Sequence, residues 1–150
     1  FNKIYQKNNT AKLILVGAGN GQQNIIDKVK NLALSDSVLF LGNRTDVNKI
    51  LQAMDVFLFP SLYEGLPLSI IEAQAAGLPC VISDNVPPEC IVTDLIEAVS
   101  LDDALAKWEI VITSKKSVKR KDTYELIKKS GFDVKSNVLV LEKMYYTDLS

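Results

Sequence analysis

Short apolar runs alternate with longer stretches of mixed polarity over the first 100 residues of the chain. The apolar runs are nearly continuous, as in strands that a parallel sheet buries on both faces. We expect strands at residues 11–17, 37–42, 55–60 and 79–83, and one or two further, shorter strands from residues 89–93 and 96–101. Helical spacing or a helix-forming composition marks the residues between them, at 21–34, 45–54 and 67–76. This order predicts an α/β fold with a mostly parallel sheet and right-handed crossovers.

The pattern changes after Leu101. Helices are predicted at residues 102–112, 117–129 and 134–148, and Gly131 is placed to end the second of them. The chain also opens on residues typical of the end of a helix. Because a sheet domain rarely starts inside a helix, we expect the chain to be part of a longer protein, with residues 1–150 forming one domain whose segment 102–150 is mainly helical.

Composition narrows the class of protein. The chain has 150 residues, 47% of them apolar, and a formal charge of −1, which suits one globular domain with a core of its own. We find no signal peptide and no apolar run near the roughly 18 residues that span a bilayer. A soluble, cytoplasmic protein is expected, with peripheral contact at the inner face of the cell membrane left open.

Metal and triad chemistry are disfavoured by the residue inventory. The chain has no histidine, and its two cysteines lack metal-ligand spacing, so a zinc site or a Ser-His-Asp triad within the chain is excluded and no metal is expected. Cys80 lies in an apolar run, where a buried inert thiol is expected. The lack of a disulfide framework suits a reducing compartment.

Residues 107–129 hold eight lysines and arginines against three acids. We interpret this basic segment as a solvated helix face, and contact with anionic lipid remains an alternative. Few aromatic residues interleave the charges, so binding of nucleic acid is not expected.

In open α/β sheets, ligands bind at the carboxyl ends of the strands. Four loops should meet at that edge, at residues 17–22, 42–46, 60–67 and 83–89. The first has glycines at 17, 19 and 21, which is G-x-G-x-G and a poor match to the dinucleotide fingerprint. The glycines would still let backbone amides approach a ligand near a helix start, although an ordinary strand-to-helix turn explains them equally.

The third loop carries two carboxylates around a predicted helix start. Pro67 suits the first position of a helix, which leaves the amides of Leu68 and Ser69 among the free donors of the first turn. Glu64 lies ahead of this helix end and Glu72 one turn beyond it. Two carboxylates oppose a lone phosphate but suit a diphosphate with polyols at both ends, as in a nucleotide-sugar. The alternative is an exposed glutamate on a surface helix.

Residues 40–84 resemble the C-terminal domain of family 4 retaining glycosyltransferases, also called group 1, which have the GT-B fold. The E-x7-E motif from Glu64 to Glu72 and the surrounding "PS..EG.P....EA.A.G.P" pattern carry the resemblance, and residues 11–22 and 131–145 extend it. Residues 102–130 match loosely. The resemblance implies a Rossmann-like three-layer αβα domain, the donor-binding half of an enzyme with two such domains.

The resemblance also implies roles for individual residues. Glu64 would contact hydroxyls of the donor sugar and act in catalysis, and Glu72 would hold the ribose. Backbone groups from Gly65 to Ser69 would contact the sugar and the diphosphate, and the loop from Leu41 to Arg44 would lie at the base. The donor-binding set is Gly17, Gly19, Gly42, Asn43, Arg44, Glu64, Gly65, Leu66, Pro67, Leu68, Ser69 and Glu72.

The implied reaction is transfer of a hexose from a nucleotide-sugar, by default a UDP-sugar, to a glycan or lipid-linked acceptor in polysaccharide biosynthesis. No cofactor is expected besides this co-substrate. The N-terminal acceptor domain and the basic pair that holds the diphosphate are expected outside this chain, so the chain alone should be inactive. Alternatives are a nucleotide-sugar epimerase, a sugar phosphorylase or a non-catalytic nucleotide-binding module.

Overall fold

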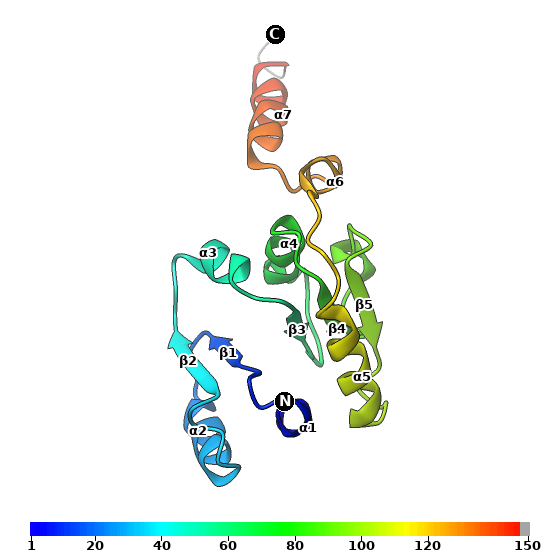
Figure 1. Cartoon of the computed structure of the whole chain (residues 1–150). Coiled ribbons are helices and arrows are strands. Elements are labelled where there is room, and N and C mark those ends of the chain that lie inside the picture. Colours follow the sequence, from blue (N-terminus) through cyan, green and yellow to red (C-terminus); the bar gives the residue numbers. More distant parts are fainter. Residues whose placement is uncertain (148–150) are drawn as a thin grey trace. The chain divides into compact units, whose positions relative to one another are not determined.

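The computed structural model describes residues 1–147, which form two compact units (Figure 1). The first unit runs from Phe1 to Val47 and the second begins at Asn48. Their strands pair in parallel, in one sheet of order β1-β2 and another of order β3-β4-β5. This confirms the predicted α/β fold with parallel strands. No helix within residues 1–147 has the length and apolar content needed to cross a bilayer.

The first unit is a parallel strand pair joined by a helix. Its elements are α1 (Asn2–Lys7), β1 (Leu13–Val16), α2 (Gln22–Asn31) and β2 (Val38–Gly42). The helix at the start of the chain and the strand–helix–strand order agree with the sequence analysis. After α2 the chain turns through Ala33 at φ +53°, a left-handed conformation that glycine adopts more easily.

The second unit carries the longer sheet and the remaining helices. Its elements, with α3 starting at the unit boundary, are α3 (Val47–Gln52), β3 (Phe57–Phe59), α4 (Leu68–Ala75), β4 (Cys80–Ser83), η1 (Pro88–Cys90), β5 (Ile96–Val99), α5 (Leu105–Lys115), α6 (Tyr124–Lys129) and α7 (Val134–Thr147). Residue 148 of the predicted last helix lies outside the described residues. Gly131 follows α6 at φ +82°, which confirms the predicted stop.

The core of the second unit forms around β4, the central strand, whose four residues are all fully buried. Burial on both faces is what the continuous apolar run predicted. Val81 and Val99 form one cluster with Trp108 and Val111 of α5, which therefore covers this face of the sheet. Removing such large side chains from water supplies the main stabilising free energy of the unit.

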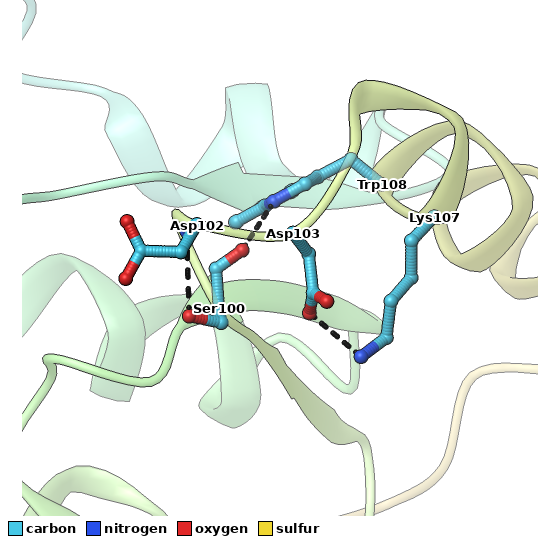
Figure 2. A network of polar contacts seen from close by, with 5 residues as sticks. All are labelled: Ser100, Asp102, Asp103, Lys107 and Trp108. Atoms are coloured by element: carbon cyan, nitrogen blue, oxygen red, sulfur yellow. Dashed lines mark hydrogen bonds and ion pairs between the residues drawn. The ribbon is translucent and has the colours of Figure 1, made fainter.

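A small polar network fixes α5 to the end of β5 (Figure 2). The indole Nε1 of Trp108 donates a 2.9 Å hydrogen bond to the carbonyl oxygen of Ser100, and the Ser100 hydroxyl accepts from the amide of Asp102. Lys107 pairs with Asp103 at 2.6 Å, one helical turn apart. Trp108 is thus buried with its polar atom satisfied.

Of the two segments expected to supply one or two short strands, 96–101 contains β5 and 89–93 forms none. Pro88 begins a short 3-10 helix there, and the amides of Val92 and Thr93 donate to the side-chain oxygen of Gln74, both at 3.0 Å. A strand would need those amides for its ladder, so the buried glutamine on α4 replaces strand pairing in this segment.

The predicted helix at 117–129 begins only at Tyr124, because the residues before it are bound to α3 and α4. Arg120 donates to backbone carbonyls of both helices, and Thr123 donates to the carbonyl of Gln74 at 2.6 Å. Arg120 is exposed, as the interpretation of a solvated helix face expected, but it does not lie in a helix and it binds backbone carbonyls. A run of charges does not reveal that its partners are carbonyl groups at helix ends.

Candidate functional site

The N-terminus of α4 is the centre of the candidate site. The helix begins at Leu68, so Pro67 occupies the cap position (φ −75°, ψ 100°) and not the first helical position that the sequence suggested. The carbonyl of Pro67 accepts the amide of Ile70 at 3.1 Å. Within residues 1–147, the amides of Leu68 and Ser69 have no hydrogen-bond acceptor. Two donors at the positive end of the helix are thus available to an anion.

Glu64 lies in the loop between β3 and α4 and is half-buried. Its Oε1 accepts a 2.7 Å hydrogen bond from the hydroxyl of Ser61. The backbone oxygen of Ser61 in turn accepts from the hydroxyl of Ser83, a fully buried residue at the end of β4. The carboxylate is therefore attached through its neighbour to the central strand of the sheet.

Glu72 has a different environment, on the second turn of α4. It is exposed, and no hydrogen bond or ion pair of its carboxylate occurs among the described residues. Both of its oxygens are therefore open to hydroxyl groups of a ligand. Along the chain, the hydrogen-bonded carboxylate of Glu64 comes before the unpaired amides at the start of α4, and the unpaired carboxylate of Glu72 comes after them.

Gln74 holds α4 in place and was missed by the sequence analysis. It is fully buried, and its Nε2 donates to the carbonyl oxygens of Ile70 and Cys90, the latter at 2.7 Å. Its Oε1 accepts from both the amide and the hydroxyl of Thr93. A polar residue among small ones in "EAQAAG" was the available signal. A buried, fully paired amide of this kind fixes helix position because any movement leaves a polar group unsatisfied.

The opposite end of α4 is clamped by the segment that the sequence analysis took for a solvated face. Arg120 donates to the carbonyl of Ala76 at 2.7 Å and to those of Leu51 and Met54 near the end of α3. An arginine suits this place because carbonyls at helix C-termini carry partial negative charge. Gly77 lies against the same segment. Gly77 and Ala73 are buried, whereas Ala75 is exposed.

The first unit holds the remaining candidates. Gly17 and Gly42 have φ of +122° and +62°, and the amide of Gly17 donates to the carbonyl of Gly42 at 2.7 Å. These backbone conformations favour glycine at both positions. Gly19 has open space around its α-carbon. Asn43 is exposed.

Arg44 forms a bidentate ion pair with Asp46, with both N···O distances at 2.8 Å. The hydrogen bonds to Asp46 raise the pKa of the Arg44 guanidinium and lower the pKa of the Asp46 carboxyl. Both side chains are partly exposed, so this ion pair is a weak surface interaction.

Neither cysteine has the properties of a nucleophile. Burial raises the pKa of the Cys80 thiol to about 12 and also raises the pKa of Cys90. The thiolate, which is the reactive form, is therefore scarce at neutral pH. The structure confirms that Cys80 is buried, and its inertness stays a prediction. Among the residues that the structure describes, no cluster of three or more potential ligands could hold a metal ion.

Comparison of the sequence with known proteins identifies a family. The sequence model described as "Glycosyl transferases group 1" matches residues 1–109. EpsF of Bacillus subtilis, provisionally named a glycosyltransferase, is 34% identical over 138 residues, which cover 89% of this chain and 36% of EpsF. The Escherichia coli UDP-Gal:alpha-D-GlcNAc-diphosphoundecaprenol alpha-1,3-galactosyltransferase is 48% identical over 62 residues, 41% of this chain and 16% of that protein.

Solved structures share the fold of this chain. The pneumococcal O-GlcNAc transferase GtfA, solved with UDP and GlcNAc, superimposes with a TM-score of 0.75 at 18% identity, over 99% of this chain and 31% of that one. The chain thus spans about a third of EpsF and of GtfA. With a family match over more than half of its residues, this chain belongs to the group 1 glycosyltransferases and has the α/β architecture of their C-terminal domain.

Proposed function

We propose that the chain is the donor-binding part of a retaining glycosyltransferase that transfers a hexose from a UDP-sugar to a glycan or lipid-linked acceptor. The observation that carries this proposal is the pair of unsatisfied amides at the start of α4, with Glu64 and Glu72 on either side along the chain. Helix-end amides suit a diphosphate, and carboxylates suit hydroxyl groups. A nucleotide-sugar presents both kinds of group in that order.

Each group has a distinct role in this proposal. The amides of Leu68 and Ser69 bind the diphosphate and stabilise the negative charge that develops as it leaves. Glu72 accepts hydrogen bonds from the ribose, and Glu64 accepts them from the sugar beside the reacting carbon. Gly17, Gly42 and Asn43 of the first unit stay expectations from the family resemblance and carry no part of this proposal. No metal takes part in this scheme.

The relatives support the choice of donor and acceptor. The name of the E. coli enzyme states a UDP-Gal donor and a lipid diphosphate acceptor, and the pneumococcal enzyme was solved with UDP. These names support a role of the parent protein in polysaccharide or lipid-linked glycan synthesis, and we further propose that it works in the cytoplasm beside a membrane that holds the acceptor. Acceptor recognition and the basic residues for the diphosphate belong to parts of the parent protein outside this chain.

The proposal is tested with the full-length protein and a panel of UDP-, GDP- and ADP-sugars, by measuring release of the nucleoside diphosphate with and without lipid-linked or glycan acceptors. We expect release that depends on an acceptor and is strongest with one UDP-sugar. Glu72→Gln should reduce it, whereas Glu125→Gln, an exposed carboxylate on α6, should not. Epimerisation without acceptor, turnover that requires inorganic phosphate, or binding without turnover would each contradict a transferase.

A further inference from the structure

Hydrogen bonds hold the first part of the loop that carries Glu64, whereas Pro67 at its end is buried. The two side chains between Ser61 and Glu64 are exposed, Leu62 to 79% and Tyr63 to 87%. These two side chains therefore contribute no apolar burial that would fix the turn. What connects it to the sheet is the hydroxyl of Ser83, which donates to the backbone oxygen of Ser61.

The geometry of the strands explains this connection. β3 and β4 are parallel neighbours, with Phe59 opposite Ile82, so Ser61 and Ser83 both lie at the carboxyl ends of adjacent strands. Ser83 is fully buried and therefore has few alternative positions. Its hydrogen bond anchors the start of the loop to the most buried strand of the second unit.

The hydroxyl of Ser61 passes this constraint on to Glu64. It has one proton and two acceptors in reach, Oε1 of Glu64 at 2.7 Å and the carbonyl of Tyr63 at 3.3 Å. The shorter bond to a carboxylate is the stronger of the two. It engages Oε1, and Oε2 of Glu64 remains for a ligand.

We propose that Ser61 is a positioning residue for Glu64. Turnover of the donor sugar then depends on the Ser61 hydroxyl, whereas binding of the nucleotide does not. This inference rests on the proposed function, in which Glu64 meets the sugar. A carboxylate fixed before the donor arrives need not lose side-chain freedom when it binds, and it holds the sugar in one orientation. Ser83 contributes by keeping Ser61 in place.

The test uses the full-length protein with three single substitutions: Ser61→Ala, Ser61→Thr and, as a control, the exposed Ser117→Ala. UDP affinity is measured by calorimetry, and kcat/KM with the UDP-sugar that the wild type uses best. Ser61→Ala should keep UDP affinity within about 2-fold and lower kcat/KM about 10-fold, the lower limit for losing a hydrogen bond to a charged group. Ser61→Thr, which keeps the hydroxyl, should recover most of the rate, and Ser117→Ala should match the wild type.

A double-mutant cycle separates positioning from a general structural effect. In a Glu64→Gln background, Ser61→Ala should add little further loss, because Ser61 acts through Glu64. Independent losses, or equal loss of UDP affinity and of turnover, would overturn the inference. The inference would also be overturned if Ser61→Ala left kcat/KM unchanged while Glu64→Gln lowered it.

Failure of Ser61→Ala to fold and inactivity of the wild type are two outcomes that need separate readouts. If Ser61→Ala does not fold, Ser61→Cys keeps the size of the side chain with a weaker donor, and the same split between UDP affinity and turnover should appear at smaller magnitude. A wild-type protein that neither binds UDP nor transfers sugar contradicts the proposed function itself. That result differs from one in which only the Ser61 substitutions are without effect, which contradicts the inference alone.

Discussion

Replacing Gly77 with alanine should destabilise the second unit much more than the same change at Gly131. Both glycines directly follow a helix in a left-handed conformation, with φ of +66° and +82°. Both also close the same hydrogen-bonded turn: Gly77 donates to Gln74 and the residue after it to Ala73, and Gly131 makes the equivalent pair at the end of α6. The two sites are therefore matched in backbone geometry.

They differ in what a new methyl group would meet. A Cβ at Gly131 has nothing within 4 Å, so alanine there costs only the left-handed backbone, about 1–2 kcal/mol. A Cβ at Gly77 would lie 2.2 Å from the carbonyl oxygen of Lys121, a backbone atom that cannot rotate away. Overpacking adds about 1–3 kcal/mol, which gives roughly 2–5 kcal/mol in total.

Urea unfolding followed by circular dichroism measures both variants against the wild type. We expect the free energy of unfolding of Gly77→Ala to fall at least 1 kcal/mol or so further than that of Gly131→Ala, about 4–8 °C in melting temperature for a unit of this size. Equal losses would refute the reasoning, because they would mean that the contact with Lys121 contributes nothing.

Three further outcomes follow from local geometry. Arg120→Lys keeps the charge but loses the branched guanidinium that donates to carbonyls at the ends of α3 and α4, so the free energy of unfolding in urea should drop by about 1–3 kcal/mol. An unchanged value would mean that these hydrogen bonds do not stabilise the second unit. Ala33→Gly relieves a left-handed alanine and should raise the free energy of unfolding by up to about 1 kcal/mol, whereas a decrease would show that φ +53° is not strained there. Cys80, whose pKa burial raises to about 12, should not react with a thiol reagent at pH 8 until the protein is unfolded, and prompt labelling of native Cys80 would argue against that environment.

The parts of the fold that were predictable are those set by local patterns. Continuous apolar runs gave the strands β1 to β5 to within a few residues, and Gly131 gave the end of α6, because strand burial and left-handed turns depend on residues close in sequence. The carboxylates of the E-x7-E motif were found for the same reason: their spacing along one loop and helix is visible in the sequence.

Apart from the position of Pro67, which was off by one residue, the missed features depend on contacts between residues far apart in the chain. Gln74 bonds to residues 16 to 19 positions away and thereby turned an expected strand at 89–93 into a loop. Arg120 reaches carbonyls 44 to 69 positions away, which composition alone cannot show because every residue has a carbonyl. The link from Ser83 to Ser61 likewise requires knowing that β3 and β4 are neighbours.

The central claim is that the two glutamates meet opposite ends of one donor, and titration of the full-length protein with UDP and with a UDP-sugar tests it most directly. Glu72→Gln should weaken both ligands by about 10- to 150-fold, the loss of roughly 1.5–3 kcal/mol expected for a charge-assisted hydrogen bond, because both contain the ribose. Glu64→Gln should leave UDP affinity unchanged and impair binding and use of the UDP-sugar. If Glu64→Gln weakens UDP as strongly as Glu72→Gln does, or if neither substitution changes binding or turnover, the assignment of the two ends is wrong.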